Sequence, residues 1–189
     1  MKTNYNFWYL LFLLALLFQG CQTDDNITPE DIETLPRQTV TTVEGLYLLN
    51  EGNMGSNKAS LDYYDYETEN YRRNIYSQAN PEATLGLGDV GNDIGVYGSK
   101  VYAVINNSNK IEVMDATTSK RLKVIDVKNC RYIIFANGKA YASAYDGEAQ
   151  LGDNSPNGFV AEIDTTLLSI TRTVKVGRQP EQMAVVDNK

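Results

Sequence analysis

An internal repeat of short apolar segments is the feature that most constrains how this chain can fold. The segment Lys100–Ala103 matches Lys139–Ala142, which lies 39 residues further along. Ile111–Thr118 matches Val160–Thr166 in the same way, and Leu61–Thr68 is a weaker third copy. Repeats of roughly 40 to 50 residues are typical of β-propellers and related arrays. The sequence therefore predicts several copies of one small β-unit.

Each unit is expected to contain four antiparallel strands separated by turns rich in Gly, Asn and Asp. In the second unit the expected strands are 92–97, 101–106, 110–115 and 121–127. In the third unit they are 131–136, 140–145, 158–164 and 169–175. The first unit offers only three strands, at 45–50, 59–65 and 70–75, and a last strand is expected at 181–186. No amphipathic helix is expected.

The predicted strands are apolar on both faces. Val101, Ala103 and Ile105 lie on one side of the same strand, and Tyr102 and Val104 lie on the other. A sheet with one face in water would alternate apolar and polar residues, whereas blades stacked between neighbouring blades are buried on both faces. We therefore expect an all-β fold, a partial β-propeller of about three four-stranded antiparallel blades over residues 43–189.

The first 20 residues are expected to be a signal peptide rather than part of the fold. The apolar run Phe7–Phe18 has the length of a signal-peptide core and is too short to span a bilayer core of about 30 Å. Gly20-Cys21 follows directly and resembles the bacterial lipobox, which implies lipidation of Cys21. The alternative is a plain signal peptide followed by a chance cysteine.

Residues 21–42 are polar and acidic, and they contain Pro29 and Pro36, so a flexible tether is expected between the lipid and the blades. Asp24-Asp25 resembles the surface-export signal of Bacteroidota lipoproteins. That resemblance implies a lipid-anchored protein exposed on the cell surface at the outer membrane.

Composition excludes several classes of function. The chain has no histidine, which removes the usual Ser-His-Asp triad and a leading zinc ligand. The net charge of −7 argues against binding to nucleic acid. If Cys21 carries lipid, Cys130 has no partner for an internal disulfide. We expect no catalysis, no cofactor and no bound metal.

Antiparallel order places the long loops on one face of the predicted blades, where binding residues commonly concentrate. These loops are 51–58, 76–91, 106–109 and 146–157. The opposite face carries short turns that begin at Asp65, Asp115 and Asp164, whose carboxylates are expected to close the turns rather than to perform chemistry. The 13 tyrosines are expected mainly to pack between blades, and the alternative is stacking on a sugar or another flat ligand.

The segment Val176–Ala184, with a glycine, a proline and then an apolar strand, resembles the blade junction of YncE-like seven-bladed propellers. Leu49–Gly55 and Asn106–Ile111 resemble surface propeller lipoproteins of Bacteroidota, and the resemblance covers about residues 45–189. The best understood members of that group capture cobalamin and pass it to an outer-membrane transporter, and others have no assigned ligand. The resemblance implies that candidate ligand-binding residues face the ligand, namely Asn50, Glu51, Asn53, Asn106, Asn107 and Arg131. Arg131 follows Cys130 where relatives tend to have proline, which favours a buried loop cysteine.

Three blades are fewer than the four to eight that typically close a propeller. We therefore expect a truncated chain, or completion by another chain or by self-association. The function expected from these features is capture of a small nutrient at the cell surface without catalysis. The alternatives are an adhesion or scaffold propeller and a propeller enzyme such as a lyase or a quinoprotein-type dehydrogenase.

Overall fold

The computed structural model describes residues 43–148 and 155–186, which belong to a compact unit spanning Thr42–Lys189. The predicted signal peptide, the tether and Cys21 lie outside the described residues. Within them, no helix has the length and apolar character needed to cross a membrane.

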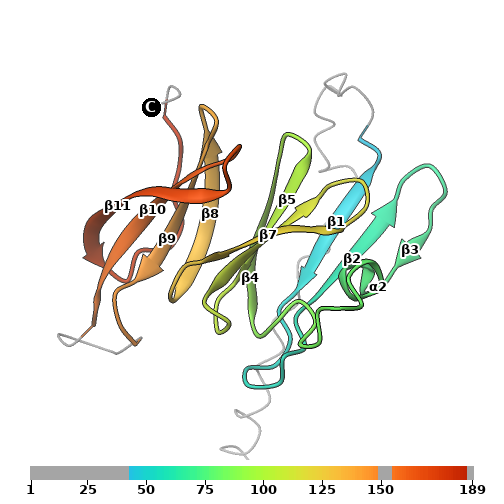
Figure 1. Ribbon diagram of the computed structural model, residues 1–189, viewed down its shortest axis with the longest axis horizontal. Helices are drawn as coiled ribbons and strands as arrows, with labels where there is room; N and C mark the ends of the chain where they lie inside the picture. The colour runs from blue at the N-terminus through green and yellow to red at the C-terminus, as the bar shows by residue number, and fades with distance from the viewer. Residues whose placement is uncertain (1–42, 149–154, 187–189) are drawn as a thin grey trace, which may run out of the picture. The chain divides into compact units, whose positions relative to one another are not determined.

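Three antiparallel sheets make up the unit, and the strand order in each sheet follows the chain (Figure 1). We call them the first, second and third blades. The first contains β1 (Gly45–Asn50), β2 (Ser60–Asp65) and β3 (Tyr71–Arg72). The second contains β4 (Gly91–Tyr97), β5 (Lys100–Ile105), β6 (Lys110–Asp115) and β7 (Arg121–Asp126). The third contains β8 (Cys130–Ala136), β9 (Lys139–Tyr145), β10 (Asn157–Asp164) and β11 (Ser169–Arg178). The chain is thus all-β and forms a partial β-propeller, as predicted.

Two predicted strands are wrong. The expected strand at 70–75 shortens to β3, and a helix, α2 (Ile75–Ala79), follows it. Asn74 causes this change, because its left-handed backbone (φ 50°) turns the chain and its N–H donates to the Asp62 carboxylate at 2.7 Å. Ile75 and Tyr76 are buried after this turn, whereas Tyr71 in β3 is exposed.

The expected strand at 181–186 is absent because no described strand pairs with it. Contacts with the third blade hold the segment instead. The Ser143 hydroxyl donates to the Glu181 carbonyl at 2.7 Å, and Pro180 lies where a Cβ on Gly158 would be.

The second blade is packed on both faces, which confirms the central prediction about its strands. Val101, Ala103 and Ile105 belong to a first core, shared with residues of the first blade and α2 such as Leu61 and Tyr76. The opposite side of the same strand belongs to a second core, which the second blade shares with the third; its buried members include Tyr102, Val104, Ile111, Val113, Ile133, Ala140, Ala142, Ala144, Ala161 and Ile163. The second blade accordingly lies between the other two in Figure 1.

The innermost strands of the second and third blades contact each other directly. Gly95 in β4 makes this possible, because a Cβ there would lie 2.5 Å from the Phe135 ring. Phe135 stacks on Tyr97 with ring centroids 5.2 Å apart. Asp93 also joins the strands, since its carboxylate accepts from the Ile133 N–H at 2.8 Å. Burial raises the pKa of Asp93 above its usual range.

The three aspartate turns are structural, as predicted. Each carboxylate accepts hydrogen bonds from the N–H groups two and three residues further on, at 2.8–3.0 Å. The fourth residue after each aspartate has a left-handed backbone, with φ between 52° and 57°; these residues are Glu69, Ser119 and Leu168. The backbone hydrogen bonds lower the pKa of Asp65, Asp115 and Asp164. One sequence pattern thus gives one turn conformation three times.

Candidate functional site

Asp89 organises the face that carries the long loops. Its carboxylate accepts from the Gly55 N–H at 2.7 Å and from the Asn107 amide at 2.6 Å. The backbone N–H of Asp89 donates to the Ser108 hydroxyl at 2.9 Å. The Asn107 amide and the backbone N–H groups of the β1–β2 loop lower the pKa of this carboxyl, and burial opposes them. The buried aspartate therefore ties the β1–β2 loop to the β5–β6 loop in the first and second blades.

The predicted ligand-binding asparagines mostly make contacts within the protein. The Asn50 amide donates to the Asp62 carboxylate at 2.8 Å, and the Asn106 amide donates to the Cys130 carbonyl at 2.8 Å. With Asn107 on Asp89, these three amides join loops and strands to one another. They do not converge on one point.

The remaining predicted residues also lie apart. The carbonyls of Glu51 and Asn53 accept backbone hydrogen bonds, while both residues are exposed. Arg131 lies on the third blade, where its guanidinium donates to Glu181 at 3.1 Å and covers the Tyr145 ring at 5.3 Å. The loop face therefore holds the six predicted residues without assembling them into one pocket.

A cleft on the opposite face brings together residues that the sequence did not single out as a site. It has a volume of about 460 Å³ and lies between the first blade, α2 and the β6–β7 turn. We call it the tyrosine cleft; its lining is Glu44, Tyr47, Tyr63, Asp65, Arg72, Ile75, Gln78, Ala79, Ala116, Thr117, Thr118 and Ser119. An adjoining hollow of about 600 Å³ shares Glu44, Tyr63 and Asp65 and adds Val43, Tyr66 and Glu67.

Aromatic rings form the wall of the tyrosine cleft. Tyr47 and Tyr63 are tilted at 55° with their centroids 5.0 Å apart. The Tyr47 hydroxyl donates to the Ala116 carbonyl, which fixes this ring against the β6–β7 turn. Arg72 lies over the Tyr63 ring at 5.1 Å from its centroid. Burial raises the pKa of both Tyr47 and Tyr63, so the two hydroxyls stay protonated at neutral pH.

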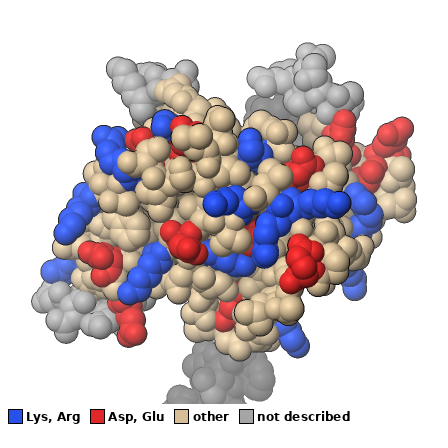
Figure 2. Space-filling model, in the orientation of Figure 1, with Lys and Arg blue, Asp and Glu red and all other residues tan. Residues whose placement is uncertain are grey.

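The polar groups of the cleft include both signs of charge. Glu44 and Asp65 supply carboxylates, and Arg72 supplies a guanidinium. The lowered pKa of Asp65, due first to the Thr68 backbone N–H, keeps that group ionised at neutral pH. On the side of the molecule shown in Figure 2, basic and acidic side chains are interspersed rather than separated. The cleft thus offers donors, acceptors and ring surfaces within a short distance.

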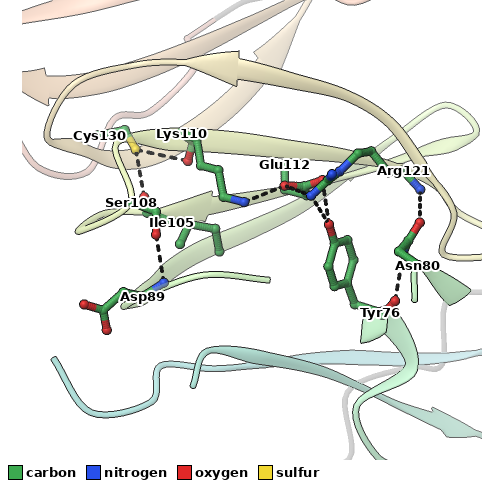
Figure 3. Close-up of polar contacts among 9 residues, drawn as sticks. All are labelled: Tyr76, Asn80, Asp89, Ile105, Ser108, Lys110, Glu112, Arg121 and Cys130. Atoms are coloured by element: carbon green, nitrogen blue, oxygen red, sulfur yellow. Dashed lines mark hydrogen bonds and ion pairs between the residues drawn. The ribbon is translucent and has the colours of Figure 1, made fainter. Parts of the chain in front are cut away.

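A buried polar network fixes the wall of the cleft (Figure 3). Glu112 on β6 is fully buried and accepts from the Tyr76 hydroxyl and from Lys110, both at 2.8 Å, and also from Arg121. Arg121 donates to the Tyr76 hydroxyl at 2.5 Å. Burial, followed by the Glu112 carboxylate, raises the pKa of Tyr76 well above its usual range.

Asn80 completes the network by joining α2 to the β6–β7 turn. Its amide donates to the Tyr76 carbonyl at 2.8 Å and to the Ser119 carbonyl at 2.9 Å, and its oxygen accepts from the Arg121 N–H at 2.8 Å. This network was not predicted from the sequence. A glutamate inside the apolar run Ile111–Met114 was the available signal, because a charged residue buried between blades needs partners from a neighbouring element.

Metal-ligating side chains do not form a cluster in the described part of the chain. No three His, Cys, Asp or Glu residues there are placed to hold a metal ion. Cys130 is fully buried, and burial raises the pKa of its thiol to about 12. The thiol donates towards the Lys110 carbonyl at 3.4 Å, so it is a packed core group rather than an activated nucleophile.

Several solved structures are similar to this chain, and three of them have a TM-score of 0.49. Kuenenia stuttgartiensis hydrazine synthase is 16% identical over 63% of this chain, and a chain of a nidogen/laminin complex is 13% identical over 71%. Pyrococcus horikoshii acylaminoacyl peptidase is 17% identical over 74%. This chain spans 30%, 45% and 24% of those three chains, respectively.

No curated protein matches the sequence significantly. A family profile does match, and it covers residues 44–189, which is most of the chain and includes all three blades. The chain therefore belongs to the family described as "Domain of unknown function (DUF5074)".

Proposed function

We propose that this protein binds a small polar ligand without chemical conversion, and that the tyrosine cleft is its binding site. The cleft itself carries the proposal. Small-molecule sites are typically hollows of roughly 300–1,000 Å³ with aromatic walls and a few placed polar groups. The volume of about 460 Å³, the Tyr47–Tyr63 pair and the charged groups fit that description.

Rigid support favours binding at this place. A site that is already formed loses less entropy when the ligand enters. Tyr47 is fixed by its bond to Ala116, and α2 is fixed through Tyr76 and Asn80. Two walls of the cleft are therefore held by hydrogen bonds before any ligand arrives.

We further propose that the protein works as a lipid-anchored surface protein that captures a nutrient for an outer-membrane transporter. The lipobox-like Gly20-Cys21 and the acidic pair Asp24-Asp25 support this location. The resemblance to surface propeller lipoproteins of Bacteroidota and of the YncE-like group makes cobalamin one ligand to test.

Titration calorimetry on the mature full-length chain tests binding at the cleft. A panel of cobalamin and short oligosaccharides serves as the probe set. We expect at least one probe to bind, and Tyr63→Ala to weaken that binding by tenfold or more, which corresponds to about 1.4 kcal/mol. Asn53→Ala, on the opposite face, is the matched control and should leave the affinity unchanged.

Two results would contradict the proposal. If no probe binds the wild-type chain but it captures a transporter from solubilised membranes, the scaffold alternative replaces it. If a probe binds equally well to wild type and Tyr63→Ala but not to Asn107→Ala, the site lies on the loop face.

A further inference from the structure

The polar groups around the tyrosine cleft point to one class of ligand. We infer that the cleft takes a neutral saccharide, an inference that rests on the binding function proposed above. Three observations carry it: the balance of charge, the mixture of hydrogen-bonding groups and an exposed tyrosine beside the opening.

The charge balance disfavours an anionic ligand. Carboxylates of Glu44, Asp65 and Glu67 line the cleft and its adjoining hollow, whereas Arg72 is the one basic residue among the described linings of both. A carboxylate or phosphate entering there would meet like charges, which is costly away from bulk water. The lowered pKa of Asp65 keeps this repulsion in place at neutral pH.

The acidic lining attracts a cationic ligand, but such a ligand would compete with a cation that is already in place. The face of the Tyr63 ring that would attract a cation already carries Arg72, at 5.1 Å from the ring centroid. A ligand ammonium group would have to displace this guanidinium. A neutral ligand can leave Arg72 in place and accept hydrogen bonds from it.

The hydrogen-bonding groups match a ligand with many hydroxyls. A hydroxyl both donates and accepts, so it can pair with carboxylates and with a guanidinium at once. Carboxylates at Glu44 and Asp65 accept and Arg72 donates. The exposed Gln78 amide donates to the Arg73 carbonyl at 2.8 Å, and its oxygen adds a further acceptor. Adjacent hydroxyls on a sugar ring would meet acceptors and donors side by side in this lining.

Tyr66 provides the apolar contact that a sugar ring needs. Its side chain is 48% exposed and lines the hollow next to the cleft. The Tyr66 ring makes an edge-on contact with Tyr64, with centroids 5.5 Å apart. A large exposed aromatic ring is a suitable surface for the C–H face of a pyranose.

The test is calorimetry of the full mature chain with four probes: cellotriose (neutral), trigalacturonate (anionic), a chitosan trimer (cationic) and cobalamin. We expect cellotriose to bind and the two charged trimers to bind at least tenfold more weakly. Tyr66→Ala should weaken cellotriose binding tenfold or more, and Tyr66→Phe should retain it. Because Tyr66 is exposed, both variants should keep the wild-type melting temperature.

The outcomes separate this inference from the binding function on which it rests. Tighter binding of trigalacturonate, of the chitosan trimer or of cobalamin, lost in Tyr63→Ala, overturns the saccharide class and leaves the cleft as the binding site. Cellotriose binding that is unchanged in both Tyr66→Ala and Tyr63→Ala overturns the assignment of the sugar to this cleft. Failure of all four probes to bind counts against the binding function itself.

Discussion

The two cores on either side of the second blade are built in different ways. The second core, towards the third blade, consists of apolar groups, with three alanines of β9 set against Tyr102, Val104 and other large side chains. The first core, towards the first blade, surrounds a fully buried carboxylate, Glu112, paired with Lys110 and Arg121. The interface between the second and third blades thus depends on apolar packing. The interface between the first and second blades depends also on paired charges.

This difference shows how a repeat can acquire a distinct role at one position. Position 112 of the second blade corresponds to Asp62 in the first blade and Ala161 in the third, counting back from the turn aspartate. Asp62 is satisfied by its own blade, through Asn50, Tyr71 and Asn74. Glu112 instead recruits Tyr76 from the preceding blade connection. The charged position therefore joins two repeats and forms part of the support for the tyrosine cleft.

The largest expected effect tests the second core, between the second and third blades. Ile163→Ala should lower the free energy of unfolding by about 4 kcal/mol, because a fully buried isoleucine leaves a cavity that close packing cannot refill. Urea unfolding followed by circular dichroism measures this change. Ile163→Val is the control and should cost about 1 kcal/mol. Equal losses for the two variants would mean that this core is loosely packed.

The next largest effect tests the first core, between the first and second blades. Glu112→Ala should lower the free energy of unfolding by about 3 kcal/mol, because Arg121 and Lys110 lose their buried carboxylate partner. Both basic side chains are partly exposed, so water can solvate part of their charge. Glu162→Ala is the matched control, because Glu162 also pairs with an arginine and a lysine but is more exposed. A comparable loss in both variants would show that burial of Glu112 adds nothing.

A smaller effect concerns the alanines of β9. Ala142→Leu should cost about 2 kcal/mol, because the added atoms meet a filled interface between the second and third blades. Thermal unfolding of the variant measures the loss. Val96→Leu, at an exposed site on β4, gives the baseline for a comparable enlargement. A stabilised Ala142→Leu variant would reveal empty space in the second core.

A pH-dependent effect is expected at Asp93, between the inner strands. Its pKa is raised by burial, so the unfolded chain loses this proton first as pH rises and the folded state becomes relatively less stable. Asp93→Asn keeps an acceptor for Ile133 and removes the charge. The variant should be slightly more stable than wild type near about pH 7 and equal to it near about pH 3. A difference of the same size at both pH values would exclude ionisation as its cause.

The last prediction concerns the reactivity of the Cys130 thiol and needs no substitution. With its thiol buried and its pKa raised to about 12, Cys130 should resist alkylation by iodoacetamide in the folded protein and react fully in denaturant. Peptide mass spectrometry identifies the modified residue. Rapid labelling of the native protein would show that the second core opens at this strand.

The sequence was sufficient for the blades and insufficient for the cleft. Two-faced apolar strands and repeated aspartate turns are local patterns, and β6 begins and ends at the predicted residues 110 and 115. The tyrosine cleft joins Tyr47 and Arg72 of the first repeat with Ser119 of the second, which lies far along the chain from both. Such a juxtaposition depends on how neighbouring blades pack, which no single repeat encodes.

Two loop asparagines were predicted to bind a ligand, but in the structure they make contacts within the protein. Asn106 and Asn107 are polar, clustered and located in a loop, which is the usual pattern of a binding site. In the structure the Asn106 amide donates to the Cys130 carbonyl, and the Asn107 amide donates to Asp89 Oδ2. Backbone and carboxylate groups near a core need partners as much as a ligand does. Polarity in a loop thus could not distinguish the two roles.

Burial of β5 on both faces has a consequence for how the fold opens. Every residue from Val101 to Ile105 is at most 1% exposed, and β5 lies between β4 and β6 within its sheet. The amide hydrogens of this strand can exchange only when β4 or β6 parts from it, and both of those strands are themselves packed against neighbouring blades. Deuterium should therefore enter β5 last, at the rate of global unfolding, while β11 at the open edge of its sheet exchanges through local fluctuations.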